Sequence, residues 1–329
     1  MRAFITATGA CLPELVITNK ELASQLELDP EQIFKSSGIR QRHWVSNGVT
    51  TSSLASTALR SALQTADLLP SEIDYLLLGT MTADRFIPGS ASAVQQQVGL
   101  GEIPSLDIRA ACCNTLYGLQ LARALFASGV ARNVALCLAE VQSAFLRLEP
   151  VAGTTSMLFG DGAAALIISA EPGPDSIEIL DLQLATNGSY VDDLGIRCPG
   201  SEFRNGSALG DDFYPRMVGQ SVILQASRRM VAACQTVLER NGLVANDVRW
   251  VVPHQANANL LAQVARGLGL TDMSRVISVI EKTGNTSSAS MGLALDELRH
   301  RGTIRAGDWI LLPAFAAGFT WGAALCRAQ

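Results

Sequence analysis

The stretch SLDIRAACCNTLYGL, residues 105–119, contains a short apolar strand followed directly by the start of a helix. Two alanines and Cys112 occupy the junction between them. The first residues of a helix have unpaired N–H groups and the positive end of the peptide dipole, which lower a thiol's pKa and donate hydrogen bonds to an oxyanion. Cys112 is therefore a candidate nucleophile, although a buried structural cysteine is the commoner role of a free thiol.

Short apolar strands alternate with amphipathic helices on both sides of this junction. Leu54, Ala58, Leu59 and Leu63 recur at helical spacing, and residues 75–78 form a continuous apolar run. Continuous apolar strands are typical of a buried, mostly parallel sheet. The sequence therefore predicts an α/β fold with helices packed on both faces of the sheet.

The chain also contains an internal repeat. Residues 62–80 and 237–255 share one pattern, in which a helix end, a polar turn and an apolar strand follow one another. Farther along, Asn114 and Asn285 each open an apolar helix that an apolar strand follows at nearly the same offset. Because two such units can share one layer of helices between two sheets, we predict a duplicated five-layer αβαβα architecture.

This repeat predicts that the chain consists of two halves. Residues 1–172 form the half that carries Cys112, and residues 173–329 form the other. The second half contains a stretch at about 187–220 that is rich in Gly, Asp and Pro and lacks periodicity. We expect this stretch to be an inserted loop region that serves as a lid or as part of a subunit contact.

Two further candidate residues lie in the second half. His254, in VVPHQAN, follows an apolar strand, and strand ends are where α/β proteins place their active sites. Asn285, in KTGNTSSAS, precedes a helix of small residues. The alternative roles are a buried structural histidine and a helix N-cap. The duplication places Cys112, His254 and Asn285 at corresponding sheet edges, where they can converge.

Composition excludes several classes of function. The chain has 329 residues, of which 48% are hydrophobic, and a net charge of -5, so it can bury a large core but has no general attraction to nucleic acid or to an anionic membrane. Its seven cysteines form no C-x-x-C motif, and an odd number argues against a disulfide framework. We expect a cytoplasmic protein, since the apolar run at residues 1–9 is too short for a signal peptide or membrane span.

Six motifs, in order along nearly the whole chain, are together highly specific: GACLPELVITN at 9–19, SGIRQRH at 37–43, FGDGA at 159–163, PHQAN at 253–257, GNTS at 284–287 and GFTWG at 318–322. With them the sequence resembles the β-ketoacyl-acyl-carrier-protein synthase III family of condensing enzymes, in the thiolase superfamily. The resemblance implies the five-layer thiolase fold and a homodimer.

The resemblance also implies the roles of the candidate residues. Cys112 would be the acylated nucleophile, and His254 and Asn285 would hold the thioester carbonyl of the second substrate. The backbone amides of Cys112 and Ala317 would form the oxyanion hole. No metal or redox cofactor is implied, because the substrates are themselves acyl-coenzyme A or acyl-carrier thioesters.

The implied reaction is acyl transfer from a thioester to Cys112, followed by decarboxylative Claisen condensation with a malonyl thioester to give a 3-oxoacyl product. The acyl carrier protein is the implied protein partner. Two alternatives remain open from the sequence. One is an acyltransferase of specialised metabolism that moves the acyl group from Cys112 to a non-malonyl acceptor, and the other is a non-catalytic thiolase-like protein.

The resemblance suggests substrate-binding roles for four residues. Ile87 falls where the family places a side chain that lines the acyl pocket, and Asn257 and Phe319 belong to two of the shared motifs. Arg147 lies near expected entrance residues and is a candidate contact for an acidic acyl tail, with a surface ion pair to Glu149 as the alternative.

The sequence departs from the family at positions that usually contact coenzyme A or the carrier, namely Gln32, Ser36, Gly153 and Asn259. These replacements remove an aromatic ring and cationic side chains, so they argue against acetyl-coenzyme A as the donor. Arg228, Arg229 and Arg266 offer a different basic surface for an acidic carrier.

Overall fold

The computed structural model describes residues 2–204, 207–208 and 210–329. Nine strands of the described residues form one large sheet with the order β11-β12-β13-β8-β1-β7-β6-β4-β5. The strands of the first half are β1 (Phe4–Cys11), β4 (Tyr75–Gly79), β5 (Ser105–Ile108), β6 (Asn133–Glu140) and β7 (Gly162–Ser169). Those of the second half are β8 (Ile177–Thr186), β11 (Val248–Val251), β12 (Trp309–Ala316) and β13 (Thr320–Ala328).

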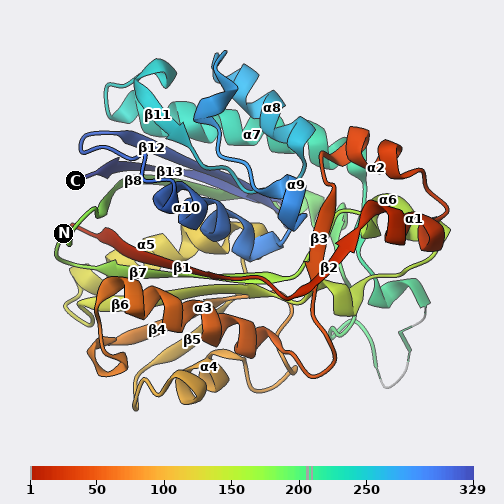
Figure 1. The fold of residues 1–329 in the computed structure, drawn as a ribbon, viewed down its shortest axis with the longest axis horizontal. Helices are drawn as coiled ribbons and strands as arrows, with labels where there is room; N and C mark the ends of the chain where they lie inside the picture. Colours follow the sequence, from red (N-terminus) through yellow and green to blue (C-terminus); the bar gives the residue numbers. More distant parts are fainter. Residues whose placement is uncertain (1, 205–206, 209) are drawn as a thin grey trace.

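The helices form three layers around the two halves of this sheet (Figure 1). One outer layer contains α3 (Thr51–Ala66) and α4 (Ala91–Val98), and the other contains α7 (Gly219–Arg240) and α8 (Ala258–Gly267). The central layer contains α5 (Asn114–Ala127) and α10 (Ser290–His300), which lie between the two parts of the sheet. Separate clusters of buried apolar side chains fill the central layer and the two outer interfaces. The predicted five-layer architecture is confirmed.

The predicted strand directions are wrong. Neighbouring strands run parallel in the pairs β4/β5, β4/β6 and β11/β12, and antiparallel in the other five pairs of the large sheet. The apolar runs result from the helices that cover both faces of each strand, and this burial is independent of strand direction. The two halves are also joined edge to edge, because Phe4 and Ile5 of β1 pair with Glu178 and Ile177 of β8.

The central helices pack unusually close to the sheet, which positions the turns that precede them. A Cβ atom on Gly118 of α5 would lie 2.4 Å from a methyl carbon of Leu136 in β6. A Cβ atom on Gly292 of α10 would lie 2.6 Å from Cβ of Ala164 in β7. At Gly292 the close neighbour is a fixed Cβ atom, so a larger residue would displace the helix, whereas at Gly118 a larger residue would require the Leu136 side chain to move.

The smaller elements form a layer of their own beside the sheet. The hairpin of β2 (Leu15–Thr18) and β3 (Gln41–Trp44) packs with α1 (Asn19–Leu26), α2 (Pro30–Ser37), α6 (Gly153–Ser156) and α9 (Ile280–Thr283). Within the predicted loop region, β9 (Leu194–Gly195) pairs antiparallel with β10 (Arg216–Met217). Residues 205–206 and 209 of that region, and Met1 of the N-terminal run, lie outside the described residues.

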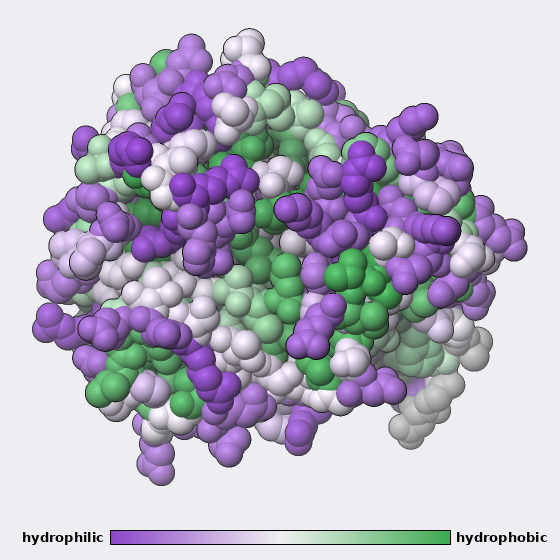
Figure 2. Space-filling model, viewed as in Figure 1, coloured by the Kyte–Doolittle hydropathy of each residue, from purple (hydrophilic) through white to green (hydrophobic). Residues whose placement is uncertain are grey.

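The outer surface agrees with the amphipathic character of the helices. Hydrophilic residues dominate the periphery of the face shown in Figure 2, and hydrophobic residues are exposed mainly in its middle. Among the described residues, no helix is both long enough and apolar enough to cross a membrane. The boundary predicted at 172/173 falls between the end of β7 and the start of β8 and stays a prediction.

Candidate active site

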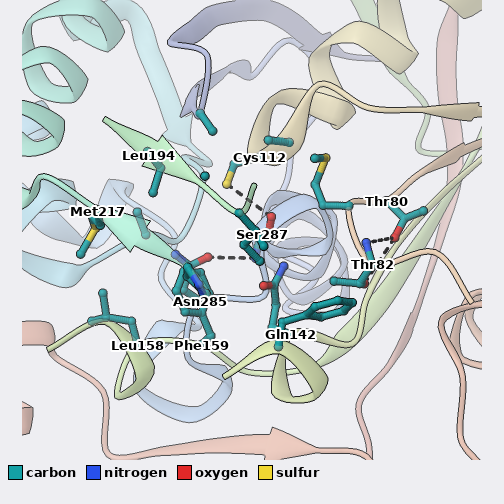
Figure 3. Close-up of a pocket in the computed structure, with 18 of the residues that line it drawn as sticks. Thr80, Thr82, Cys112, Gln142, Leu158, Phe159, Leu194, Met217, Asn285 and Ser287 are labelled. Carbon is teal, nitrogen blue, oxygen red and sulfur yellow. Dashed lines mark hydrogen bonds between the residues drawn. The ribbon is translucent and has the colours of Figure 1, made fainter. Parts of the chain in front are cut away.

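A cavity of about 600 Å³ lies where the two halves meet. Cys112, His254, Asn285, Asn257 and Ala317 all line it. The loop region also contributes to its wall, through Leu194 and Met217 among other residues (Figure 3). The structure therefore brings the three candidate catalytic side chains into one pocket, as the duplication led us to expect.

Cys112 occupies the turn η2 (Ala111–Cys113), between the end of β5 and the start of α5. Its Sγ atom lies 3.4 Å from Oγ of Ser287, which comes from the turn before α10 (Figure 3). Burial raises the pKa of the Cys112 thiol to about 12, and the Ser287 hydroxyl offsets only part of this effect. The lowered pKa expected at a helix start is thus not found, because desolvation of the thiolate outweighs the favourable local contacts.

A buried carboxyl group that the sequence analysis did not single out lies behind this turn. Glu140, the last residue of β6, is fully buried and accepts hydrogen bonds from Thr82 Oγ1 at 2.8 Å and from the Met81 N–H at 3.1 Å. Ser288 Oγ donates a further hydrogen bond to it. Burial raises the pKa of Glu140, which these hydrogen bonds counteract. Only its position at the end of an apolar strand could have signalled this residue in the sequence.

The carboxyl group is connected to the nucleophile turn through side chains of both halves. Asn114 Nδ2 donates to Ser288 Oγ at 3.0 Å. Asn114 Oδ1 accepts the N–H of Ala110 at 2.7 Å, two residues before Cys112. All three side chains of this chain of hydrogen bonds are fully buried, so it fixes the Cys112 turn against the turn that precedes α10.

His254 follows β11 and is nearly fully buried, and its Nδ1 atom lies 2.6 Å from Ser290 Oγ. Ser290 Oγ also accepts the N–H of Gln255 at 3.2 Å. The imidazole nitrogen is the acceptor available to the Ser290 hydroxyl hydrogen, which favours the tautomer with a proton on Nε2. Burial lowers the pKa of His254 to about 4, so at neutral pH the ring is an uncharged N–H donor.

Asn285 is held so that its amide N–H₂ group remains available. Its Oδ1 atom accepts the N–H of Ser287 at 2.9 Å, as the dashed line in Figure 3 shows. Its backbone is fixed by hydrogen bonds between the Asn285 N–H and Leu158 O at 2.8 Å and between the Gly160 N–H and Asn285 O at 3.1 Å. The side chain therefore presents Nδ2 as a second donor in the same pocket as His254.

The pocket contains a thiol and two uncharged donors, and it is the sequence comparisons that assign this constellation to a family. The family model described as 3-Oxoacyl-[acyl-carrier-protein (ACP)] synthase III matches residues 106–188, and the model of its C-terminal part matches residues 238–328. A Streptomyces coelicolor protein, beta-ketoacyl-[acyl-carrier-protein] synthase III 3, is 40% identical over 97% of this chain and 95% of its own length.

The chain belongs to the 3-oxoacyl-[acyl-carrier-protein] synthase III family.

Solved structures agree with this assignment. The crystal structure of the synthase III from Aquifex aeolicus superimposes with a TM-score of 0.90 at 34% identity, over 99% of this chain and 100% of the other. The priming β-ketosynthase from the R1128 polyketide pathway gives a TM-score of 0.90 at 29% identity, over 99% and 96% of the two chains. As a member of the synthase III family, the chain is an enzyme of the acyltransferase type with a thiolase fold.

The proposed substrate-binding residues of this synthase III chain fall in different places. Asn257 lines the pocket and ties α8 to α2, because its Nδ2 donates to Ser36 O at 2.9 Å. Ile87 is 77% exposed and is not among the residues that line the pocket of the single chain. Phe319 is buried in the wall behind the pocket, stacked on Tyr190 with ring centroids 5.0 Å apart.

Arg147 does not line the pocket either. It forms ion pairs with Glu149, at 2.7 Å, and with Asp211. These two carboxylates hold the guanidinium group on the loop surface, so the surface ion pair considered as the alternative from the sequence is the one that forms, and the acidic acyl tail is not supported.

Gln142 is a second residue that the sequence analysis missed, and unlike Glu140 it lines the pocket. It begins the turn η3 (Gln142–Phe145) directly after β6, is 6% exposed, and lines the same pocket as Cys112. A polar residue after an apolar strand is common in any sequence, and nothing near Gln142 in the chain marks it as part of a site.

Proposed function

We propose that this synthase III family member catalyses decarboxylative condensation of an acyl thioester with a malonyl thioester, with Cys112 as the acyl carrier. The observation that supports this proposal is the single pocket in which a thiol faces two uncharged N–H donors, His254 and Asn285, whose acceptor atoms are already occupied. Such donors stabilise negative charge that develops on an oxygen without removing a proton.

In the proposed first half-reaction, the Cys112 sulfur attacks the donor thioester carbon, and the bond to the donor sulfur breaks. The thiol proton leaves with the released coenzyme or carrier thiol, so the products are the acylated Cys112 and a free thiol. We assign the stabilisation of the tetrahedral oxyanion to the backbone N–H groups of Cys112 and Ala317, both of which belong to pocket-lining residues. Exchange of one thioester for another conserves the activated acyl group.

In the proposed second half-reaction, the malonyl thioester loses CO₂, and the electron pair of the broken carbon–carbon bond stays on the thioester as an enolate. His254 Nε2–H and Asn285 Nδ2–H donate to the enolate oxygen, where the charge develops. The enolate carbon attacks the acyl carbon on Cys112, and the bond to sulfur breaks, which gives the 3-oxoacyl thioester and a thiolate that takes up one proton. Every transferred group comes from the two thioesters, so we propose that no resident cofactor takes part.

We further propose that the acyl carrier protein docks over α7 and α8. Val222 and Ile223 of α7 line the pocket, and the adjacent Arg228 and the α8 residue Arg266 are exposed cations. Arg229 lies over the ring of Trp321, 4.2 Å from its centroid, and so has a packing role as well. Exposed arginines beside the pocket suit an acidic partner that delivers a thioester.

The assembly and compartment belong to the same proposal. β5 is an edge strand of the large sheet, and Leu106 on β5, Phe86 and Ile87 are large, exposed apolar side chains. An unprotected edge with exposed apolar residues supports a homodimer formed there. All seven cysteines are free thiols, which supports a reducing compartment such as the cytoplasm.

The two half-reactions can be tested separately. Purified protein is incubated with an acyl-coenzyme A, and the mass of the intact chain is measured to detect an acyl adduct on Cys112. A malonyl carrier thioester labelled at the free carboxyl is then added, and released CO₂ and the 3-oxoacyl product are quantified. Equal amounts of CO₂ and 3-oxoacyl product are expected. Transfer of the acyl group to another acceptor without release of CO₂ would contradict the proposal and support the alternative acyltransferase.

A further inference from the structure

Gln142 differs from every other buried polar side chain of the pocket wall. It is 6% exposed, and its carboxamide makes no hydrogen bond with any other described residue. Figure 3 shows its side chain directed into the pocket, toward the space beside Ser287 and Asn285. The carboxamide thus lies within the site, largely shielded from bulk solvent.

The neighbouring polar side chains each have at least one hydrogen-bond partner in the protein. Thr80 and Thr82 donate hydrogen bonds to Glu140, at 3.5 Å and 2.8 Å respectively. His254 bonds to Ser290, and the Asn285 carbonyl oxygen bonds to the backbone. Because Gln142 lines the pocket, water can bond to its carboxamide, and a bound chain that displaces this water without offering a partner would leave the amide unsatisfied.

Apolar side chains also line the pocket, which suits it to an alkyl chain. They include Met81, Phe145 and Phe159, whereas Phe86, which is also among the lining residues, is 71% exposed. Apolar walls bind a hydrocarbon chain but offer no hydrogen-bond partner to a polar substituent on it. A carboxamide, in contrast, both donates and accepts hydrogen bonds. The combination fits a chain that is mostly hydrocarbon and carries one oxygen at the level of Gln142.

We propose that Gln142 selects acyl donors whose chain bears a hydroxyl or oxo group over unsubstituted alkanoyl donors. This inference rests on the proposed function, since it concerns the acyl group that Cys112 receives. The amide N–H₂ donates to a hydroxyl or oxo oxygen, and the amide oxygen accepts from a hydroxyl. An unsubstituted chain would bury the carboxamide without a partner, and the site would therefore discriminate against it.

The test measures loading rates on Cys112 by intact-mass spectrometry. The donors are butanoyl-coenzyme A, its 2-, 3- and 4-hydroxy derivatives and 3-oxobutanoyl-coenzyme A. The wild-type chain should load at least one oxygenated donor about tenfold faster than butanoyl-coenzyme A. Gln142→Leu should abolish this preference and load butanoyl-coenzyme A at least as fast as the wild type does.

Two further variants make the test specific. Gln142→Met removes the amide but keeps the length of the side chain. It should lose the preference as Gln142→Leu does, which would show that the shorter leucine side chain is not the cause of the loss. Gln235→Leu makes the same chemical change at an exposed position of α7 and should keep the wild-type preference.

Four outcomes would overturn the inference. The first is an oxygen preference that both Gln142 variants retain, and the second is a wild type without any preference. The third involves Arg85 and Arg109, which line the pocket and have no ion pair with another described residue. If succinyl-coenzyme A is the preferred donor and Arg109→Ala rather than Gln142→Leu removes that preference, the cations select the substrate. If no donor loads at all, the proposed function itself fails, and the inference fails with it.

Discussion

The turns that precede the two central helices have the same backbone form and different surroundings. The turn η2 (Ala111–Cys113) precedes α5, and the turn η9 (Ser287–Ala289) precedes α10. Each begins with a non-glycine residue in the left-handed region, with φ of 48° at both Ala111 and Ser287. Such a conformation costs on the order of 1 kcal/mol, so the surrounding structure must hold both turns in place.

The second residue of each turn shows what the surroundings decide. In the first turn it is Cys112, which lines the pocket. In the second turn it is Ser288, which is fully buried and donates to Glu140. One backbone form thus exposes a reactive group in one half of the chain and anchors a buried carboxyl group in the other. The local turn therefore sets the backbone geometry, whereas the neighbouring residues decide whether its second side chain has a chemical or a structural role.

Among changes in these two turns, removal of the Cys112 thiol should have the largest effect. Cys112→Ala should lower condensation by roughly 10⁴-fold or more, the order of effect seen when a catalytic nucleophile is deleted, without loss of the fold. Intact-mass spectrometry should show no acyl adduct. Cys198→Ala is the matched control, because Cys198 also lines the pocket, and that variant should still be acylated. An adduct of normal yield on Cys112→Ala would remove Cys112 from the mechanism.

The second turn contributes to the chemistry through Asn285, which lies two residues before its first residue, Ser287, and accepts the N–H of Ser287. Asn285→Ala should reduce malonyl decarboxylation by about 10²–10³-fold, the usual effect of deleting one donor to a developing oxyanion. Loading of Cys112 should change only a few-fold, because it does not use the enolate site. Separate assays of the two half-reactions measure this difference, and an equal loss in both would contradict the assigned role.

The depressed pKa of His254 predicts a pH-dependent stability. Burial lowers this pKa from 6.5 to about 4, so between these values the unfolded chain binds a proton that the folded chain does not. Stability should therefore fall by up to about 3 kcal/mol as pH falls from 6.5 to 4. Urea denaturation over this range should show a flatter profile for His254→Gln than for the wild type. Identical profiles for the two proteins would argue against a buried neutral imidazole.

The anchoring serine should affect stability more than rate. Ser288→Ala leaves the buried Glu140 without one of its donors and should lower the free energy of unfolding by about 1–3 kcal/mol. Urea denaturation measures this loss. Loading of Cys112 should persist in the fraction that is folded. A variant as stable as the wild type would show that Glu140 does not depend on the second turn.

Ser287, which precedes Ser288, should give the smallest effect, and its replacement should affect the loading rate more than the stability. Ser287→Ala removes the hydroxyl next to the Cys112 sulfur, whose hydrogen bond lowers the thiol pKa, so loading at neutral pH should slow by a few-fold. The free energy of unfolding should change less than in Ser288→Ala, because the Ser287 side chain faces the pocket. If the effects on stability and rate are exchanged between the two serines, the comparison of the turns is wrong.

The elements that the sequence predicted are those encoded by local pattern. The apolar run at residues 75–78 lies in β4, and the helix of Leu54 and Leu63 is α3. Cys112 was found because a thiol at a junction of strand and helix is recognisable in the chain itself. Strand direction was predicted wrongly, since burial on both faces leaves the same apolar pattern in parallel and antiparallel strands.

The missed residues share one property. Glu140 and Gln142 both follow the apolar part of β6, and each looks like an ordinary polar residue at the end of a strand. The role of Glu140 depends on a partner far away in sequence, Ser288, 148 positions along the chain, and that of Gln142 depends on the pocket that both halves form. Ile87 and Arg147 show the converse, because a family position alone did not place either side chain in the pocket of the single chain.

The sequence by itself determined the α/β class, the duplicated layers and the three residue types of the candidate site, because hydrophobic periodicity and short motifs are local properties of the chain. Only the tertiary structure decided which groups are desolvated and which donors remain free. Burial raises the pKa of Cys112, lowers that of His254 and leaves the Gln142 carboxamide without a partner. These effects depend on the packing of segments from both halves of the chain, and desolvation and hydrogen-bond satisfaction have no counterpart in local sequence.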